Sequence, residues 1–480
     1  MKFRDILPTT NVEEFKKKLW FTEYAFRIEE WFKGRKKGPI RIDAEITRQC
    51  NLNCIFCSRR ASQINLNEES KKIEMSKERW IELAKESAEL EVRNWSISGI
   101  GEPMMRADIT LPTMRMLKAY DIFGELTTNG TLWKESYIRE VIDMGWDSIC
   151  ISIDGPNAKI HDSLRRVKGA FKKATWTAKK FSILKKKFKS ELPYITINVV
   201  LNKMNYNKLP EMIKLAKELG ANAIFVEPMV LFSPLAEPLQ LSKEEMKELP
   251  YYIEETRELG EEYGIYPSIS AVGVNLEFDK KIVEKVSKAR EVLIEEAKKF
   301  NDEILSLPCF APWYFLMIRT DGSCSPCGEL EIHDSIRNKS LKEVWFGNIF
   351  ENIRKEFLNK NLPISCEKCR PNVINDIRQI RKSIIRGRDI TFLQKEILDL
   401  LEENRRLREE IYRIAREKTY KRREWIEKEK ELTKIKSSLT FRIISKIWNT
   451  KIGKFLKKVI FLNSREKYSY ENEKFTSTNN

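Results

Sequence analysis

The chain has 480 residues, nine cysteines, two histidines and a formal net charge of +17. The odd cysteine count and a first segment without an apolar run ("MKFRDILPTTNVEEFKKK") argue against a secreted, disulfide-bonded protein. No apolar run approaches the roughly 20 residues that span a bilayer, so we predict a cytoplasmic protein whose grouped cysteines bind metal or do redox work.

Residues 1–39 are predicted to form a charged helical segment whose aromatic side chains pack on the domain that follows. The stretch "IRIDAEIT" (40–47) alternates apolar and polar residues, which is typical of a strand. More strands are predicted within 93–98, 123–128, 147–154, 194–202 and 221–230, with an edge strand within 262–270. Because helical stretches separate these strands, residues 40–300 are predicted to form βα units and a parallel sheet, an α/β fold.

Three cysteines follow the first strand directly, in "ITRQCNLNCIFCSRR". A structural zinc site needs four ligands, and neither His161 nor His333 is close in sequence. Three thiolates suit an iron–sulfur cluster that leaves one iron open. The spacing Cys50-x3-Cys54-x2-Cys57 is the signature of the radical S-adenosylmethionine (SAM) superfamily, which the chain resembles between residues 40 and 230.

The resemblance implies a partial (β/α)6 barrel and a SAM-binding 4Fe–4S cluster on these three cysteines. It also implies that SAM is cleaved reductively to a 5′-deoxyadenosyl radical, with electrons from a low-potential donor such as ferredoxin or flavodoxin. The cofactor-binding residues that it implies are Phe56, Gly99, Gly101, Glu102, Ser152, Asp154, Arg165, Asn198 and Val226. Taken alone, these residues also fit ordinary turns, strand ends and surface charges, and no catalytic base is identified.

A second group of cysteines, Cys309, Cys324, Cys327, Cys366 and Cys369, lies within "PCFAPWYFLMIRTDGSCSPCGE" and "PISCEKCRP". Residues 301–375, which contain this group, resemble the small SPASM or twitch auxiliary-cluster domains, of α+β type. Five thiolates are too few for two complete four-thiolate clusters. We therefore predict one auxiliary 4Fe–4S cluster, held by Cys309, Cys327, Cys366 and Cys369. Cys324 is then spare, or exchanges with Cys327. A zinc knuckle on the two Cys-x2-Cys pairs is the alternative. Cys150, inside the apolar "SICISI", is predicted to be a buried, inert thiol.

Residues 376–440 are predicted to form a coiled coil, because apolar residues repeat in heptads from Ile390 to Leu439. Asn404 at a core position and opposite charges at Glu403–Arg408, Glu417–Arg422 and Glu431–Lys436 favour a parallel homodimer through residues 390–439. The alternative is a single amphipathic helix docked on its own domain or solvated.

Residues 441–480 are predicted to form a basic amphipathic tail with a disordered end. The stretch 441–462 has six basic residues and no acidic one. This composition indicates binding to an anionic membrane surface, on the inner face of the membrane. A protein partner or RNA is the alternative. The segment 376–480 carries +12 of the net charge and the segment 1–375 carries only +5, so no specific nucleic-acid partner is indicated.

The resemblance implies an enzyme that oxidises or otherwise modifies a substrate with help from its auxiliary cluster. The C-terminal region is similar to extensions of some bacterial glycosyltransferases, so we expect a carbohydrate or cell-envelope substrate. The alternative is a peptide or protein maturase of the SPASM type. A non-catalytic coiled-coil membrane scaffold is the third hypothesis.

Overall fold

The computed structural model describes residues 12–61, 66–269, 289–330, 333–369 and 371–388. The chain divides into two units, Met1–Arg388 and Asp389–Asn480. The predicted coiled coil (390–439) and basic tail (441–462) lie outside the described residues.

Seven parallel strands form the main part of one sheet, in the order in which they occur in the chain. They are β1 (Arg41–Ala44), β2 (Asn94–Ile97), β3 (Phe123–Thr128), β4 (Ser148–Ser152), β5 (Tyr194–Leu201), β6 (Ala223–Pro228) and the edge strand β7 (Tyr266–Ile269). Each overlaps a stretch predicted as a strand, so the mixed α/β fold with a parallel sheet is confirmed, as a partial radical SAM barrel requires.

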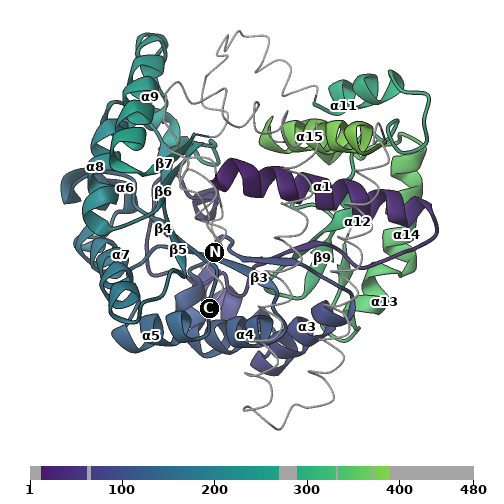
Figure 1. Cartoon of the computed structure of the whole chain (residues 1–480), viewed down its shortest axis with the longest axis horizontal. Helices are drawn as coiled ribbons and strands as arrows, with labels where there is room; N and C mark the ends of the chain where they lie inside the picture. The colour runs from purple at the N-terminus through teal and green to yellow at the C-terminus, as the bar shows by residue number, and fades with distance from the viewer. Residues whose placement is uncertain (1–11, 62–65, 270–288, 331–332, 370, 389–480) are drawn as a thin grey trace, which may run out of the picture. The chain divides into compact units, whose positions relative to one another are not determined.

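Helices cover the outer face of this sheet (Figure 1). They are α3 (Lys77–Glu89), α4 (Ala107–Ala119), α5 (Glu135–Asp143), α7 (Ala170–Lys187), α8 (Leu209–Leu219) and α9 (Lys243–Tyr263). The strand residues that face these helices are fully buried, as Ile149 and Ile151 are in β4. Cys150 lies between them and therefore faces the inner side, where it is half-buried instead of buried as predicted.

The cysteine-rich segment extends the same sheet beyond β1. Strand β8 (Phe315–Ile318) pairs parallel with β1, and β9 (Ser323–Ser325) and β10 (Asp334–Ser335) continue antiparallel, giving the order β10-β9-β8-β1-β2 at this edge. The sheet thus crosses the predicted boundary between residues 300 and 301. Helix α11 (Ala289–Lys298) precedes this segment, and the helices within it are α12 (Ala311–Tyr314), α13 (Leu341–Trp345) and α14 (Asn348–Leu358).

Two helices far apart in sequence, α1 (Val12–Phe32) and α15 (Pro371–Arg388), pack side by side (Figure 1). An aromatic side chain of α1 packs on the barrel as predicted, because the ring centroids of Trp20 and of Phe123 in β3 lie 5.9 Å apart. Tyr24 stacks on Tyr314, the last residue of α12, at 4.5 Å between ring centroids. Helix α15 begins before residue 376, the predicted start of the coiled coil, and buries Ile377 and other residues of its inner face. The packed body therefore continues to Arg388.

The remaining elements are short. They are α2 (Leu66–Ile73), α6 (Ala158–Arg165) and the 3-10 turns η3 (Ser58–Ala61), η4 (Pro103–Arg106), η5 (Tyr206–Lys208), η6 (Pro234–Leu239) and η7 (Ile364–Lys368). Most of them follow the carboxyl ends of strands. At that edge of a parallel sheet the loops converge, and binding residues from different strands meet there.

Candidate SAM and iron–sulfur site

The three cysteines of the first group lie on the loop that leaves β1, at the carboxyl edge of the sheet. Cys54 is buried, and Cys50 and Cys57 are half-buried. The loop is fastened to the end of α6, because the Asn53 and Ile55 amides donate to the carbonyl oxygens of Arg165 and Leu164 at 3.2 and 3.0 Å. Burial raises the pKa of the Cys50 thiol to about 11 and also raises that of Cys54.

Arg165 connects this loop to β4, and the structure brings it together with three other predicted site residues. Its Nε donates to Asp154 Oδ2 at 2.5 Å, and its Nη1 lies 3.5 Å from Cys54 Sγ. The guanidinium also covers the ring of Phe56, 5.4 Å from the ring centroid. Burial opposes the positive charge, but Asp154 and Cys54 raise the pKa of Arg165 above its ordinary value. A fixed cation therefore stands beside the cysteines.

Asp154 is itself held by residues that sequence reasoning did not select. Its Oδ1 accepts from the Val200 amide at 3.0 Å, and its own amide donates to His161 Nδ1 at 3.0 Å. Asn205 donates to the Asp154 carbonyl oxygen at 2.9 Å. Burial, followed by the charge of Arg165, lowers the pKa of His161 to about 4, so this imidazole is neutral at pH 7. The support fixes the carboxylate that orients Arg165.

The glycine-rich loop after β2 packs tightly on the segment after β1. Gly99 has φ +145°, and a Cβ there would lie 2.6 Å from Glu45 Cγ. A Cβ on Gly101 would lie 2.0 Å from the Thr47 carbonyl oxygen. This close approach requires glycine at both positions. It lets the Glu102 amide donate to the Gln49 carbonyl oxygen at 2.7 Å, next to Cys50.

The Glu102 carboxylate points away from solvent and accepts three hydrogen bonds. The donors are Thr128 Oγ1 at 2.6 Å, the Asn129 amide at 2.6 Å and the Met104 amide at 3.1 Å. Burial raises the pKa of Glu102, and these hydrogen bonds act in the opposite direction. In this structure Glu102 joins the loops after β1, β2 and β3.

Asn129, which the sequence presents only as part of an Asn-Gly turn, faces the cysteine loop. Its Nδ2 lies 3.9 Å from Cys50 Sγ and donates to Asn51 Oδ1 at 3.0 Å. Asn51 donates in turn to Thr131 Oγ1 at 2.8 Å. The turn after β3 therefore contributes an amide to the surroundings of the first cysteine, and no motif in the sequence signals it.

The other three predicted residues lie on neighbouring strands. Ser152 of β4 is in register with Asn198 of β5, so the two polar side chains are adjacent at the carboxyl edge. Asn198 Nδ2 donates to Glu227 Oε1 at 3.1 Å, while its buried Oδ1 has no hydrogen-bond partner. Val226 is fully buried in the hydrophobic core, apart from these polar groups.

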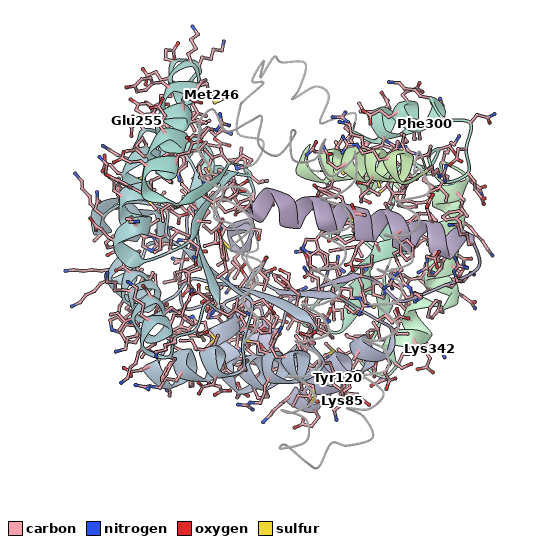
Figure 2. The ribbon with its side chains drawn as sticks, in the orientation of Figure 1. Lys85, Tyr120, Met246, Glu255, Phe300 and Lys342 are labelled. Carbon is pink, nitrogen blue, oxygen red and sulfur yellow. The ribbon has the colours of Figure 1, made fainter. Side chains whose placement is uncertain are left out.

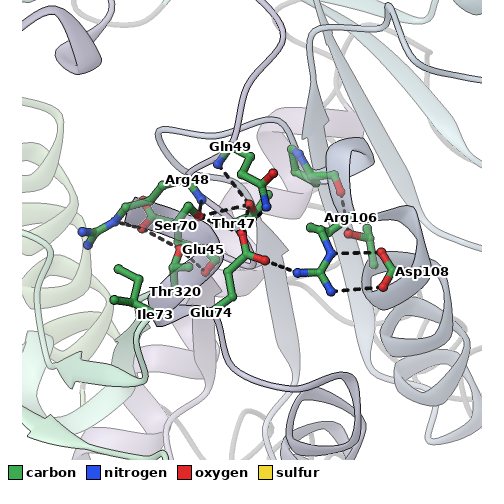
Figure 3. A network of polar contacts seen from close by, with 12 residues as sticks. Glu45, Thr47, Arg48, Gln49, Ser70, Ile73, Glu74, Arg106, Asp108 and Thr320 are labelled. Atoms are coloured by element: carbon green, nitrogen blue, oxygen red, sulfur yellow. Dashed lines mark hydrogen bonds and ion pairs between the residues drawn. The ribbon is translucent and has the colours of Figure 1, made fainter. Parts of the chain in front are cut away.

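A buried carboxylate fastens the beginning of the cysteine loop to the helix after it (Figure 3). Glu74 Oε1 accepts from Thr47, Gln49 and Ser70 at 2.5, 2.7 and 2.7 Å, and its Oε2 accepts from Arg106. Glu45 makes a second junction, accepting from Arg48 at 2.8 Å and from Thr320 of the cysteine-rich segment at 3.0 Å. Both acids are ordinary glutamates in the sequence.

In the second group, four cysteines influence one another's pKa values, and the fifth, Cys324, has other neighbours. Burial raises the pKa of Cys366 to about 12, and the Cys309 and Cys327 thiols act in the same direction. Burial and the neighbouring Cys369 and Cys327 raise the pKa of Cys309. Cys324 is fully buried in β9 and donates a hydrogen bond to the Asp334 carbonyl oxygen at 3.5 Å. Burial and the charge of Asp334 raise the pKa of Cys324, and the charge of Arg319 acts in the opposite direction.

Comparison with known proteins agrees with both groups of cysteines. Residues 44–216 match the radical SAM superfamily, and residues 309–370 match the SPASM iron–sulfur cluster-binding domain. The chain thus contains a radical SAM domain followed by a SPASM domain. As the sequence predicted, these two domains imply S-adenosylmethionine, a SAM-binding 4Fe–4S cluster and auxiliary iron–sulfur binding.

Relatives of this radical SAM protein include peptide cyclases and a heme synthase. The PqqA peptide cyclase of Methylocella silvestris is 30% identical over 187 residues, 39% of this chain and 46% of that protein. That of Rhizobium meliloti is 26% identical over 343 residues, 69% of this chain and 80% of that protein. The AdoMet-dependent heme synthase of Methanosarcina barkeri is 26% identical over 309 residues, 64% of this chain and 82% of that protein. The chain thus spans about half the length of the first of these curated relatives.

Among solved structures, Streptococcus suis SuiB bound to S-adenosylmethionine matches with a TM-score of 0.48 and 18% identity, covering 66% of this chain and 68% of that chain.

Both groups of cysteines fit the iron–sulfur clusters that the two matched domains imply. The first loop offers three thiols, and Cys54 Sγ lies 3.5 Å from a fixed cation, Arg165. Asn198 Oδ1, next to Ser152 in the sheet, is a buried acceptor without a hydrogen-bond partner. The second group offers four thiols that act on one another electrostatically. The domain matched over residues 309–370 binds iron–sulfur clusters, and this match favours the cluster over the zinc knuckle.

The described part of the chain contains no helix with the length and apolar character needed to cross a bilayer.

Proposed function

We propose that this radical SAM protein is an enzyme that abstracts hydrogen from a peptide or protein substrate and oxidises the product with its auxiliary cluster. The observation that carries the proposal is the Arg165 guanidinium, held by Asp154 and placed 3.5 Å from Cys54 Sγ. A cation fixed beside a three-thiolate loop suits a carboxylate ligand that completes the coordination of an open iron. The bound cluster and SAM supply a carbon radical that attacks unactivated C–H bonds.

The proposed roles of the chain's own residues follow from their contacts. Cys50, Cys54 and Cys57 would hold the first cluster, and Arg165 would bind the SAM carboxylate. Ser152 at the end of β4 and Asn198 beside it in β5 offer a hydroxyl and an unsatisfied acceptor to a polar ligand. Gly99, Gly101 and Glu102 are proposed to act through the backbone, because the Glu102 carboxylate already accepts three hydrogen bonds. Phe56 and Val226 are proposed to contribute apolar contact.

The auxiliary cluster is proposed to lie on Cys309, Cys327, Cys366 and Cys369, with Cys324 spare. These four thiols act on one another electrostatically, and Cys324 makes a separate hydrogen bond. An auxiliary centre gives a substrate-based radical an acceptor for its electron, which makes the reaction a net oxidation. A low-potential donor such as ferredoxin or flavodoxin is proposed to supply the first electron.

The choice of a peptide rests on relatives. The PqqA peptide cyclases match at up to 30% identity, above the 26% of the heme synthase. The expectation of a carbohydrate or cell-envelope substrate rests only on the C-terminal sequence, outside the described residues. The scaffold hypothesis is disfavoured because relatives across both domains are named as enzymes.

The first experiment tests the chemistry. The chain is reconstituted anaerobically, iron and sulfide are counted, and 5′-deoxyadenosine is measured with dithionite as reductant. We expect about eight irons and SAM cleavage, against about four irons and no cleavage in the Cys50→Ala, Cys54→Ala, Cys57→Ala variant. An absence of cleavage by the fully loaded protein would refute the proposal.

The second experiment tests the substrate class by following hydrogen. Fully deuterated bacterial cell material is separated into a peptide fraction and an envelope-glycan fraction, and each is incubated with the loaded enzyme. Deuterium in 5′-deoxyadenosine from the peptide fraction alone is the expected result. Deuterium from the glycan fraction alone would return the substrate to the carbohydrate class.

A further inference from the structure

Helix α7, on the outside of the barrel, carries a dense positive charge that the whole-chain charge conceals. Helix α7 (Ala170–Lys187) contains seven lysines and no aspartate or glutamate. The same helix exposes two large apolar side chains, Trp176 at 44% and Ile183 at 49%. Exposed apolar side chains that share one face and are bordered by charged residues are typical of an interaction surface.

The exposed apolar residues lie on the face of α7 that does not contact the barrel. The inner face buries Ala174, Ala178, Phe181 and Leu184 against the sheet and neighbouring helices. Trp176 and Ile183 are seven residues apart, so they lie one above the other on the opposite face. Residues three and four positions away flank them on both sides, and those positions hold Lys172, Lys173, Lys179, Lys180, Lys186 and Lys187. The result is an apolar ridge between two rows of lysines.

Most of this charge has no local counter-charge. Lys180 forms an ion pair with Glu135 of α5 at 2.6 Å, and Lys185 donates to the Pro193 carbonyl oxygen at 2.7 Å. Within the described part of the chain no ion pair engages Lys172, Lys173, Lys186, Lys187 or Lys189. An uncompensated row of ammonium groups attracts an extended anionic partner.

We propose that the outer face of α7 is a docking surface for an anionic lipid bilayer. Interfacial helices combine a Trp and aliphatic face with lysines, whose stems cover apolar surface while their charges reach the headgroups. The flat ridge of α7 has this composition, and with 18 residues it is about 27 Å long. A nucleic acid would also attract the lysines, but exposed Ile183 offers nothing to a phosphate backbone.

The tail sequence has a similar composition, since residues 441–462 also combine basic residues with Trp448 and no acidic residue. Stable attachment to a membrane usually takes two signals, because one weak element releases quickly. Helix α7 begins five residues after Arg165, so docking through it would hold the cysteine loop close to the membrane surface. This inference does not depend on the proposed peptide substrate.

The test uses the full chain and sedimentation with two kinds of vesicle, pure phosphatidylcholine and a mixture of phosphatidylcholine with phosphatidylglycerol. The α7 variant changes Lys172, Lys173 and Lys187 to Gln. The matched control changes three exposed lysines on other helices to Gln: Lys85 of α3, labelled in Figure 2, Lys214 of α8 and Lys355 of α14. Equal thermal midpoints of all three proteins establish that folding is unchanged.

We expect the wild type and the control to bind the anionic vesicles equally and the α7 variant about 100-fold more weakly. Brominated acyl chains should quench part of the tryptophan fluorescence of the wild type, and less in Trp176→Phe, which keeps the other ten of the 11 tryptophans. Equal vesicle binding by the α7 variant and the control would overturn the proposal. The proposal would also be overturned if the wild type bound duplex RNA at physiological salt and the α7 variant lost that binding while it still bound the vesicles.

Discussion

Replacing Arg165 with Met should destabilise the protein more than any other single change at the site. The Arg165 and Asp154 side chains are only 9% and 0% exposed, so the change leaves a carboxylate uncompensated in the interior. In this variant Asp154 Oδ1 still accepts a hydrogen bond from the Val200 amide at 3.0 Å, but Asp154 Oδ2 loses the one from Arg165. Breaking a buried ion pair from one side costs about 3–5 kcal/mol of unfolding free energy.

Urea unfolding of the anaerobic apo-protein at pH 7, followed by circular dichroism, measures this loss. The double variant Arg165→Met, Asp154→Asn removes the orphaned charge as well, and should recover about 2 kcal/mol relative to Arg165→Met alone. Equilibrium dialysis with the cluster-loaded protein should show weaker SAM binding in both variants. The reasoning fails if Arg165→Met costs less than about 1 kcal/mol, or if Asp154→Asn adds a further loss to it.

Three other outcomes are expected. Glu74→Gln replaces a 4%-exposed acceptor of four hydrogen bonds and should cost about 2–3 kcal/mol in urea unfolding, while Glu68→Gln on the exposed side of α2 should change little. Burial lowers the pKa of His161 to about 4, so on acidification the unfolded chain binds a proton at this residue before the folded chain does. The unfolding free energy should therefore fall by about 3 kcal/mol as the pH drops from about 6.5 to 4. The same fall in the His161→Asn variant would contradict this prediction. Cys324→Ala should keep the iron of the auxiliary site, and Cys327→Ala should lose about four irons, by iron and sulfide analysis.

Much of the fold was predictable because each parallel strand carries its own apolar pattern. The stretches of β1 and β4 alternate in sequence as they alternate in burial. The pairing of β8 with β1 was not predictable, since nothing local in "FLMI" identifies a partner strand so much earlier in the chain. The packed part of α15 was also missed, because its apolar spacing resembles the start of the heptads that follow.

At the site, resemblance selected Arg165 and Asp154 individually, but it predicted neither their ion pair nor the residues that support it. Asn129 reads as a turn residue, and His161 and Asn205 read as isolated polar residues in helices and loops. Their roles depend on which strand ends become neighbours, which only the folded sheet decides. The basic face of α7 was missed for another reason: the net charge of +5 on the segment 1–375 averages it against acids on other helices.

The position of β8 beside β1 also has a consequence for synthesis. One edge of β1 stays without its partner until residues 315–318 have left the ribosome, although β2 can pair with the other edge early. At about 5–20 residues per second, that interval is about 15–55 s. An open strand edge beside three reactive thiols is a site for wrong pairing with other nascent chains. The large sequence separation of β1 and β8 thus prolongs the time for which this edge is open. We expect the yield of active protein to depend on how soon the cluster is loaded and on the chaperones present during that time.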